Sequence, residues 1–325
     1  MRPFESSVDA VATIGIDLGA TRVKAGWVAG GRVQRSLIAN LAPADRSPSG
    51  IVERLADTVL ELAKAADTPL ERLAGIGIGA PGVIRFGTGT VVQSPNFPEW
   101  RDFPLAERLR QRLGVHVVLD NDANVVTLGE ARYGVGAGVG DLALLTLGSG
   151  VGGGLFLCGD LYRGSDGMAG EIGHMVVDPD GPACGCGGRG CLEQYASLNA
   201  LRAWVLRDRA YGDLTGEAVR DPRLPERLYE AAVGGDRRSQ GYFDEMGRAL
   251  AVTIGGLLNL LNLRMVILAG GIARAFPAFS RSLFEELEAR TFPAVLAGAR
   301  VVPCELWETA GILGAASLAA AVRPT

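Results

Sequence analysis

The sequence predicts a mixed α/β protein of two domains with a cleft between them. At 325 residues the chain exceeds the length over which one hydrophobic core usually grows, so two domains of roughly 100–200 residues are expected. Short apolar runs with strand character alternate with amphipathic helical repeats. A strand followed by a glycine turn occurs near residue 17 and again near residue 147, which indicates two related halves.

The first half begins with three strand-like runs. They cover residues 11–17, 23–28 and 32–38, and Gly30-Gly31 between the last two predicts a hairpin. Apolar residues then recur at helical spacing over 51–62, after Ser47-Pro48 as a cap and first-turn proline. The other elements expected here are the strands 73–79 and 115–119 and the helix 105–113.

The second half opens with a hairpin of residues 141–147 and 151–158. Apolar residues then mark one face of a long helix that ends near Leu261. The remaining expectations are a strand over 265–269, a last helix over about 312–322, and no assignment for the polar residues 207–240. We therefore expect an N-terminal α/β domain over 1–120, with a C-terminal helix at about 310–325 packed back on it, and a C-terminal α/β domain over 121–309.

Charge and hydropathy exclude several classes of function. The formal net charge is −4 and no Lys/Arg block occurs, so a nucleic acid partner is not expected. The most apolar stretch, 250–273, is interrupted by Asn259, Asn262 and Arg264 and is interpreted as core, so no membrane partner is expected either. Acidic residues in the first 17 positions spoil a secretory signal, which favours a cytoplasmic protein.

Two glycine turns are candidate phosphate-binding loops. In the first, backbone N–H groups and the Thr21 hydroxyl can face phosphate oxygens around Gly19, while Asp17 can hold Mg²⁺ directly or through water. A plain hairpin turn is the alternative. The second loop is Gly148-Ser149-Gly150, part of a GxGxxG match; a strand rather than a helix is expected after it, which removes the context of a dinucleotide-binding fold.

Thiols and one imidazole cluster in the second half. The candidate ligands are His174, Cys184, Cys186 and Cys191. Three soft thiolates and one imidazole suit tetrahedral Zn²⁺, and four protein ligands leave no position for a substrate water, so the zinc loop 174–191 would be structural. The alternative is a set of unrelated buried thiols with a core histidine.

Polar side chains near these features are candidates for sugar contacts. Asp122 is a candidate general base and Asn121 a hydroxyl donor, although Asp120 or Asn121 could instead cap the following helix. Glu171 and Glu193 flank the zinc loop, which would hold them rigidly. A proline-stiffened loop at 94–100 carries Asn96 and Trp100, the alternative being a surface loop with a packed tryptophan.

Seven segments occur in a set order along the chain: DLGAT at 17–21, APG at 80–82, SPNFPEW at 94–100, DNDAN at 120–124, LGSGVGGG at 147–154, EIGH at 171–174 and CGCGGRGCLEQYAS at 184–197. Together they resemble the ROK family of repressors, open reading frames and kinases, and within it the bacterial glucokinase branch. EIGH followed by the cysteine segment is the most specific part. The resemblance implies an actin-like ATPase (hexokinase-like) fold of two α/β domains around a cleft.

The resemblance also implies a role for each matching residue. Asp122 would be the catalytic base. The sugar would be bound by Asn96, Asn121, Asp122, Glu171, His174 and Glu193. Zinc would be bound by His174, Cys184, Cys186 and Cys191. ATP would be bound by Asp17, Gly19, Thr21, Gly148, Ser149, Gly150, Gly270 and Gly271. Ala20 and Ser149 stand where the family often has Gly and Thr, and neither change removes a needed donor.

The implied activity is transfer of a phosphoryl group from ATP, with Mg²⁺, to a hexose, giving glucose 6-phosphate if the sugar is glucose. A homodimer or higher homo-oligomer is implied. Alternatives are N-acetylglucosamine, mannose, fructose, allose or N-acetylmannosamine as substrate, and polyphosphate as donor. A sugar-sensing ROK regulator is disfavoured because about ten residues precede the first strand, too few for a helix-turn-helix. The kinase interpretation requires Asp122, Glu171 and Glu193 to face one pocket opposite the glycine turns.

Overall fold

The computed structural model describes residues 12–207 and 217–321, which form two compact α/β units. Of the described residues, the first unit contains 12–138, 161–169 and 308–321, and the second contains 139–160, 170–207 and 217–307. The predicted α/β class is confirmed, because each unit contains a mixed sheet with helices packed on it. The interpretation of the N-terminus as lacking a secretory signal concerns mainly residues 1–11, outside the described range.

The first unit is built on a five-stranded sheet in the order β3-β2-β1-β4-β8. The strands are β1 (Thr13–Leu18), β2 (Arg22–Ala29), β3 (Arg32–Asn40), β4 (Gly75–Ala80) and β8 (Val117–Asn121). β1, β2 and β3 are antiparallel neighbours, whereas β4 and β8 run parallel to β1. A small second sheet contains β5 (Val83–Arg85), β6 (Thr90–Gln93) and β7 (Arg101–Phe103).

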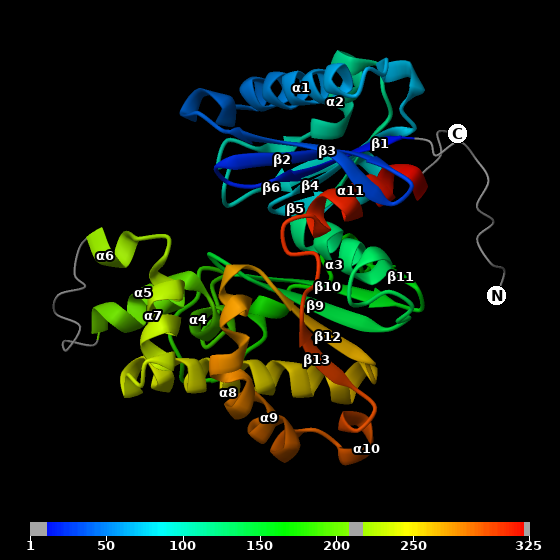
Figure 1. The fold of residues 1–325 in the computed structure, drawn as a ribbon. Helices are drawn as coiled ribbons and strands as arrows, with labels where there is room; N and C mark the ends of the chain where they lie inside the picture. The colour runs from blue at the N-terminus through cyan, green and yellow to red at the C-terminus, as the bar shows by residue number, and fades with distance from the viewer. Residues whose placement is uncertain (1–11, 208–216, 322–325) are drawn as a thin grey trace. The chain divides into compact units, whose positions relative to one another are not determined.

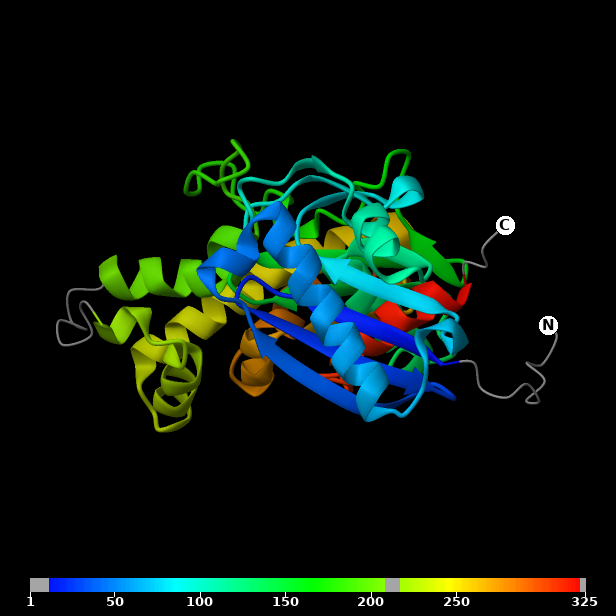
Figure 2. The ribbon, with the colours of Figure 1, turned by 90° about the horizontal axis from the view of Figure 1, so that it is seen from above.

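Four helices cover this sheet. One face carries α1 (Pro48–Ala65) and α2 (Leu105–Leu113), and the other carries α3 (Asp122–Tyr133) and α11 (Ala310–Ala321) (Figure 1). Figure 2 shows α1 lying obliquely across the strands. The predicted cap of α1 is confirmed: the Ser47 side chain accepts a hydrogen bond from the N–H of Gly50, and Pro48 opens the helix. The predicted Gly30-Gly31 turn is also confirmed, since both residues have positive φ.

Helix α11 lies unusually close to its neighbours because glycines remove the side chains between them. A Cβ atom at Gly15 of β1 would overlap the carbonyl of Ile312, and one at Gly77 of β4 would overlap the carbonyl of Ala315. On the helix itself, a Cβ at Gly314 would overlap the carbonyl of Val125 in α3. The C-terminal helix is therefore an integral part of the first unit, between its sheet and α3.

The second unit is built on a sheet in the order β11-β10-β9-β12-β13. Its strands are β9 (Leu142–Leu147), β10 (Val151–Leu157), β11 (Asp160–Tyr162), β12 (Met265–Ala269) and β13 (Arg300–Pro303). The long helices α8 (Arg237–Leu261) and α9 (Phe276–Arg290) pack against each other on this unit (Figure 1). The shorter helices are α4 (Glu193–Ala196), α5 (Leu198–Arg207), α6 (Glu217–Arg220), α7 (Leu224–Val233) and α10 (Pro293–Leu296). Within 207–240, the segment left unassigned above, residues 208–216 lie outside the described range.

The chain passes between the two units after residues 138, 160, 169 and 307. A residue with left-handed backbone lies within one position of each passage: Gly138, Gly159, Gly170 and Trp307. Trp307 is the only one with a side chain, and the guanidinium carbon of Arg274 lies 4.3 Å from the centroid of its ring system.

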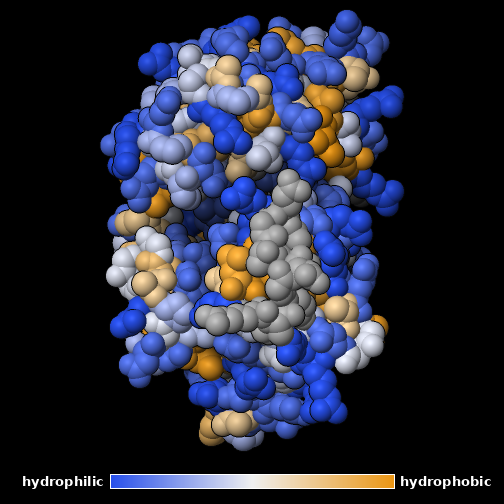
Figure 3. Space-filling model, turned by 90° about the vertical axis from the view of Figure 1, so that its left-hand side faces the viewer, coloured by the Kyte–Doolittle hydropathy of each residue, from blue (hydrophilic) through white to orange (hydrophobic). Residues whose placement is uncertain are grey.

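The face seen in Figure 3 is mainly polar. On this face, hydrophobic residues form small scattered groups rather than one large patch. None of the described helices combines the length and the hydropathy that a membrane span requires. Much of the stretch 250–273 is core as expected: α8 is largely buried up to Leu258 and β12 is buried throughout, whereas Asn259 and Leu260 are exposed.

Candidate functional site

In the first unit, the acidic candidates lie at the same edge of the sheet. Asp17 of β1 pairs in register with Gly79 of β4, and Gly79 with Asp120 of β8. Because these three strands are parallel, their carboxyl ends meet at one edge, and two strand spacings separate Asp17 from Asp120 by about 10 Å. Asp122 follows two residues later as the first residue of α3. The sheet therefore brings the predicted Mg²⁺ ligand and the loop of the predicted base to one edge.

Asp17 is half-buried. Burial is the main cause that raises its pKa, with Lys24 opposing the shift and Glu308 adding to it. Lys24 is the cross-strand partner of Asp17, and its ammonium lies 2.6 Å from a Glu308 carboxylate oxygen. A Cβ at Gly311 would lie 3.0 Å from the Asp17 carboxyl carbon, so α11 closes one side of the carboxylate. The adjoining turn is held by the Gly19 N–H, which donates to the Arg22 carbonyl at 2.9 Å.

The loop between β8 and α3 is fixed by Asn121. The Asn121 side-chain oxygen accepts from the N–H groups of Ala123 at 2.8 Å and Asn124 at 3.3 Å, so Asn121 is the N-cap of α3. Its amide nitrogen donates to the Gly82 carbonyl at 3.1 Å. Of the two capping alternatives, the structure therefore favours Asn121. One amide hydrogen of Asn121 is left for a ligand, and Asp122 projects from the first turn of the helix.

The loop at 94–100 presents an amide and buries its aromatic residues. Trp100 is fully buried, stacks on Phe97 with ring centroids 4.1 Å apart, and donates its Nε1–H to the Arg46 carbonyl at 3.2 Å. Asn96 is exposed. The structure thus favours the packed-tryptophan alternative: Trp100 shapes the loop that carries Asn96 and does not offer its ring to a ligand.

In the second unit, a predicted sugar ligand touches a predicted phosphate loop. The Glu193 carboxylate accepts the N–H of Val151 at 2.9 Å, and a Cβ at Gly150 would overlap its Oε2 atom. Position 150 is therefore glycine because the Glu193 carboxylate occupies the space of a side chain. The contact holds one carboxylate oxygen against the turn and leaves the other for a ligand.

Gly270 joins the same region. β9 and β12 are parallel, with Thr146 paired to Ala269, so Gly148 and Gly270 follow adjacent strand ends. A Cβ at Gly270 would overlap the Leu147 carbonyl, and the residue has φ +88°. The two glycine segments expected to bind ATP in this half of the chain thus lie next to each other.

The four candidate metal ligands form one cluster. One ligand atom from each of His174, Cys184, Cys186 and Cys191 lies within 4.8 Å of all the others. The Sγ atoms of Cys186 and Cys191 are 3.7 Å apart, and the Cys184 Sγ is 3.6 Å from the His174 Nδ1. A tetrahedral zinc site with Zn–S bonds of about 2.3 Å and a Zn–N bond of about 2.0–2.1 Å gives about 3.8 Å and 3.6 Å for these separations. The cluster therefore has the dimensions of a zinc site.

Two of the clustered thiols have pKa values shifted in opposite directions. Burial, followed by hydrogen bonds from the neighbouring thiols, raises the pKa of Cys191 to about 12, whereas a backbone hydrogen bond at Gly188 lowers the pKa of Cys186. A divalent cation would draw protons from such thiols on binding. The His174 Nε2 atom points the other way and lies 4.0 Å from a Glu171 carboxylate oxygen. The imidazole can thus serve the metal through Nδ1 and a second ligand through Nε2.

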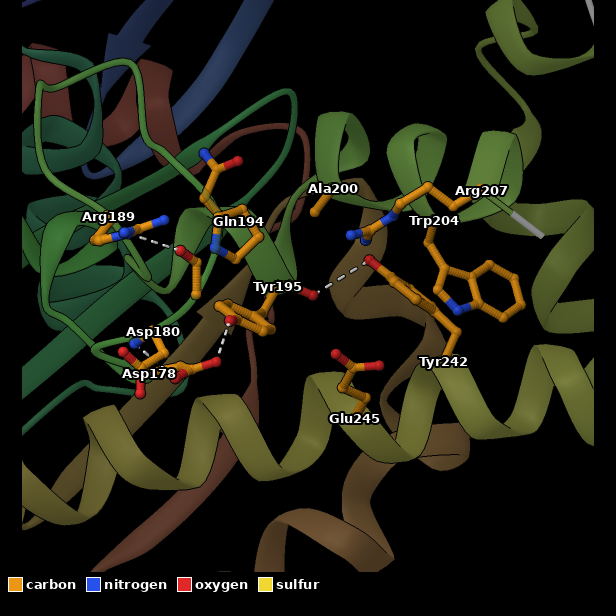
Figure 4. Close-up of a pocket in the computed structure, with 12 residues that line it drawn as sticks. Asp178, Asp180, Arg189, Gln194, Tyr195, Ala200, Trp204, Arg207, Tyr242 and Glu245 are labelled. Atoms are coloured by element: carbon orange, nitrogen blue, oxygen red, sulfur yellow. Dashed lines mark hydrogen bonds between the residues drawn. The ribbon is translucent and has the colours of Figure 1, made fainter.

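A pocket of about 490 Å³ is lined in part by residues of the loop 174–191 (Figure 4). Tyr195 and Tyr242 form part of its wall, and both hydroxyls are engaged: Tyr195 donates to Asp178 at 2.9 Å and Tyr242 to the Tyr195 carbonyl at 3.3 Å. Burial, aided by Asp178, raises the pKa of Tyr195 to about 12. None of the residues predicted to bind sugar, phosphate or metal lines this pocket, although Gln194 adjoins Glu193.

The site residues predicted from sequence fall into two sets. The first unit contains Asp17, Gly19, Thr21, Asn96, Asn121 and Asp122. The second unit contains Gly148, Ser149, Gly150, Glu171, His174, Cys184, Cys186, Cys191, Glu193, Gly270 and Gly271. The requirement that Asp122 and the two glutamates face one pocket stays a prediction. Sequence reasoning gave no role to Arg163 or Gly82, and it considered Asp120 only as a cap; a charged residue ending an apolar strand was the available signal for Asp120.

The whole chain is similar to known sugar kinases and regulators. The model of the ROK family matches residues 13–322. The glucokinase of Thermotoga maritima is 37% identical over 310 residues, which are 94% of this chain and 96% of that protein.

Two solved structures extend the similarity. A ROK family glucokinase from Streptomyces griseus, in complex with glucose and AMPPNP, is 32% identical with a TM-score of 0.78 over 96% of this chain and 100% of that one. A ROK family transcriptional regulator, a homologue of the E. coli MLC protein, is 26% identical with a TM-score of 0.84 over 95% of this chain and 78% of that one. The expected actin-like ATPase fold is confirmed by these similarities.

Proposed function

We propose that this chain, which belongs to the ROK family, is an ATP-dependent hexose kinase that converts glucose to glucose 6-phosphate. The names of its relatives support glucose as acceptor, and the glucose and AMPPNP bound to the Streptomyces griseus enzyme support a nucleotide donor. The single observation that carries the proposal is the contact between Glu193 and the Gly148–Gly150 turn. A sugar ligand fastened to a phosphate loop sets the acceptor beside the donor, as phosphoryl transfer requires.

In this mechanism Asp122 accepts the proton of the sugar's primary hydroxyl, O6, as that oxygen attacks the γ-phosphate in line. Asn96, Asn121, Glu171, His174 and Glu193 orient the remaining hydroxyls. Mg²⁺, near Asp17, would neutralise charge on the phosphates. Because the transition state of phosphoryl transfer is loose, positioning supplies most of the acceleration and the base about 10²–10⁴-fold.

The metal cluster is proposed to hold structural Zn²⁺ through the His174 Nδ1 and three thiolates. Its separations and chemistry fit that ion, and all four ligand positions are taken by protein. The residues would keep the loop that begins at His174 rigid. That loop leads into Glu193 and begins beside Glu171, so its rigidity would orient both glutamates.

A second candidate function is a sugar-sensing regulator, which the similarity to the MLC homologue supports. Other hexoses and polyphosphate remain as alternative acceptor and donor. A regulator would bind sugar without turnover, whereas each alternative kinase would turn over its own pair of substrates. Activity therefore separates these candidates.

The decisive experiment is a coupled ADP-release assay across the six sugars named above, with polyphosphate tested as donor by sugar phosphate formation. We expect sugar-dependent ADP release, highest with glucose. An Asp122→Asn variant should lose about 10²–10⁴-fold in kcat while its KM for glucose changes little, because the base acts mainly in the transition state. Wild-type protein that binds glucose yet releases no ADP with any sugar would contradict the kinase proposal.

A further inference from the structure

Asp120, two residues before Asp122, is almost completely buried, at 2% exposure. One of its carboxylate oxygens accepts the N–H of Asn121 at 2.7 Å and the side-chain amide of Asn124 at 3.0 Å. The other accepts the Nε–H of Arg163 at 2.8 Å. A buried carboxylate requires such a cation, because it would otherwise be neutralised or displaced.

Arg163 is held on the other side by an aromatic ring and by its own loop. Its guanidinium carbon lies 3.9 Å from the centroid of the Phe86 ring, and its side chain is only 19% exposed. Its carbonyl accepts the N–H of Ala169 at 3.1 Å, which closes the loop of residues 163–169. A Cβ at Gly167 in this loop would lie 2.8 Å from the Ile84 carbonyl, so the loop rests on β5.

The ion pair joins two segments that lie close in sequence to predicted site residues. Asp120 precedes the base Asp122 by two residues, and Arg163 precedes Glu171 by eight. Residues 161–169 belong to the first unit although the chain on both sides of them belongs to the second. The ion pair is therefore a direct contact between this excursion and the backbone that carries the base.

We propose that Arg163 is a positioning residue for phosphoryl transfer, acting through Asp120 on the loop from which Asp122 projects. The proposal rests on the proposed kinase function. A displacement of reacting groups by about 1 Å can cost about 10²-fold in rate, so loss of this restraint should lower kcat by roughly 10–100-fold. Binding of ATP should not change, because no predicted ATP ligand contacts the pair.

Four variants test the proposal. Arg163→Met and Asp120→Asn each leave one buried charge unpaired and should lower the melting temperature as well as activity. The double variant removes both charges, keeps the acceptor for Asn121, and places a methionine on Phe86. It should regain most of the stability of wild type yet keep a kcat roughly 10–100-fold lower, with the KM for ATP within about two-fold. Arg163→Lys, which keeps the charge without the planar fork, should give an intermediate kcat.

Turnover is compared at a temperature at which near-ultraviolet circular dichroism shows each variant folded. Arg112→Met, which breaks an exposed pair with Glu53 in the same unit, is the control and should leave kcat unchanged. A folded double variant with wild-type kcat would overturn the proposal and leave the pair a purely structural one. Failure of the kinase function itself would be seen earlier, as wild-type protein without sugar-dependent ADP release.

Discussion

The surroundings of Asp17 disfavour the charged form of its carboxyl group. Its raised pKa means that the folded state binds the proton more tightly than the unfolded state does. Stability contributed by this group is therefore present at low pH and is lost as pH rises from the unfolded value of about 4 through the folded pKa. A divalent cation bound to the carboxylate would offset the free-energy cost of burying its charge.

We predict that Asp17→Asn increases the free energy of unfolding at pH 7 and abolishes most turnover. The gain should shrink toward pH 4, where the wild-type carboxyl group is protonated and its burial no longer disfavours folding. Urea unfolding of both proteins without Mg²⁺, at several pH values, measures the difference. A difference that stayed constant with pH would show that charge burial is not its cause.

Gly150 and Gly148 provide a matched pair of substitutions in one turn. A Cβ at position 150 would displace the Glu193 carboxylate, whereas a Cβ at position 148 would meet nothing closer than 4.0 Å. Gly150→Ala should therefore break the hydrogen bond to Val151 and raise the KM for glucose by roughly ten-fold or more, because hydrogen bonds to charged groups contribute about 1.5–3 kcal/mol. Gly148→Ala should leave that KM near its wild-type value. If steady-state kinetics showed the same rise in the KM for glucose in both variants, the proposed role of Glu193 in sugar binding would be wrong.

At the scale of elements, the metal loop should behave as a folding unit. Cys186→Ser should abolish bound zinc, measured by elemental analysis, and lower the melting temperature, since structural zinc contributes to folding free energy directly. Cys158→Ser is the control, because Cys158 is exposed and lies outside the cluster. A Cys186→Ser protein that had lost zinc but had the melting temperature of wild type would refute a structural role for the metal.

Sequence periodicity located the long elements well. The hairpins, α1, the C-terminal end of α8 and the buried strands were predicted within a few residues, because a helical period and a continuous apolar run can both be recognised in local sequence. The strands β5, β6 and β7 were missed, since three or four residues carry too few alternations. α9 was missed although Phe279, Leu283 and Leu287 recur at four-residue spacing in it.

Sequence reasoning could find local motifs of the candidate site but not partnerships between residues far apart in the chain. The metal ligands are close in sequence, so their spacing alone indicated a cluster. Arg163 is 43 residues from Asp120, and no local pattern shows which acid an arginine will meet. Likewise, the sequence indicated Gly150 only as part of a phosphate turn. The folded unit shows why glycine is required there: the Glu193 carboxylate occupies the space of a side chain.

At the scale of the whole molecule, the first unit depends on both ends of the chain. Gly77→Ala should lower the free energy of unfolding by about 1–3 kcal/mol or more, because the new methyl group would overlap the backbone of α11. Gly87→Ala in the same unit is the control, since a Cβ there would meet nothing within 4 Å. Urea unfolding measures the free energy of unfolding of both variants. Equal stabilities would mean that α11 can move away from β4 without loss.

The close packing of α11 on the glycines of β1 and β4 also has a consequence for the order in which the first unit can fold. The helix that completes the first unit is synthesised after the second unit, whereas the strands it covers are synthesised before it. Until α11 has been made, the face of β1 and β4 that carries Gly15 and Gly77 has no cover from this helix. This unit can therefore reach its native state only after α11 has been made, and not when the segment that ends at residue 138 has emerged.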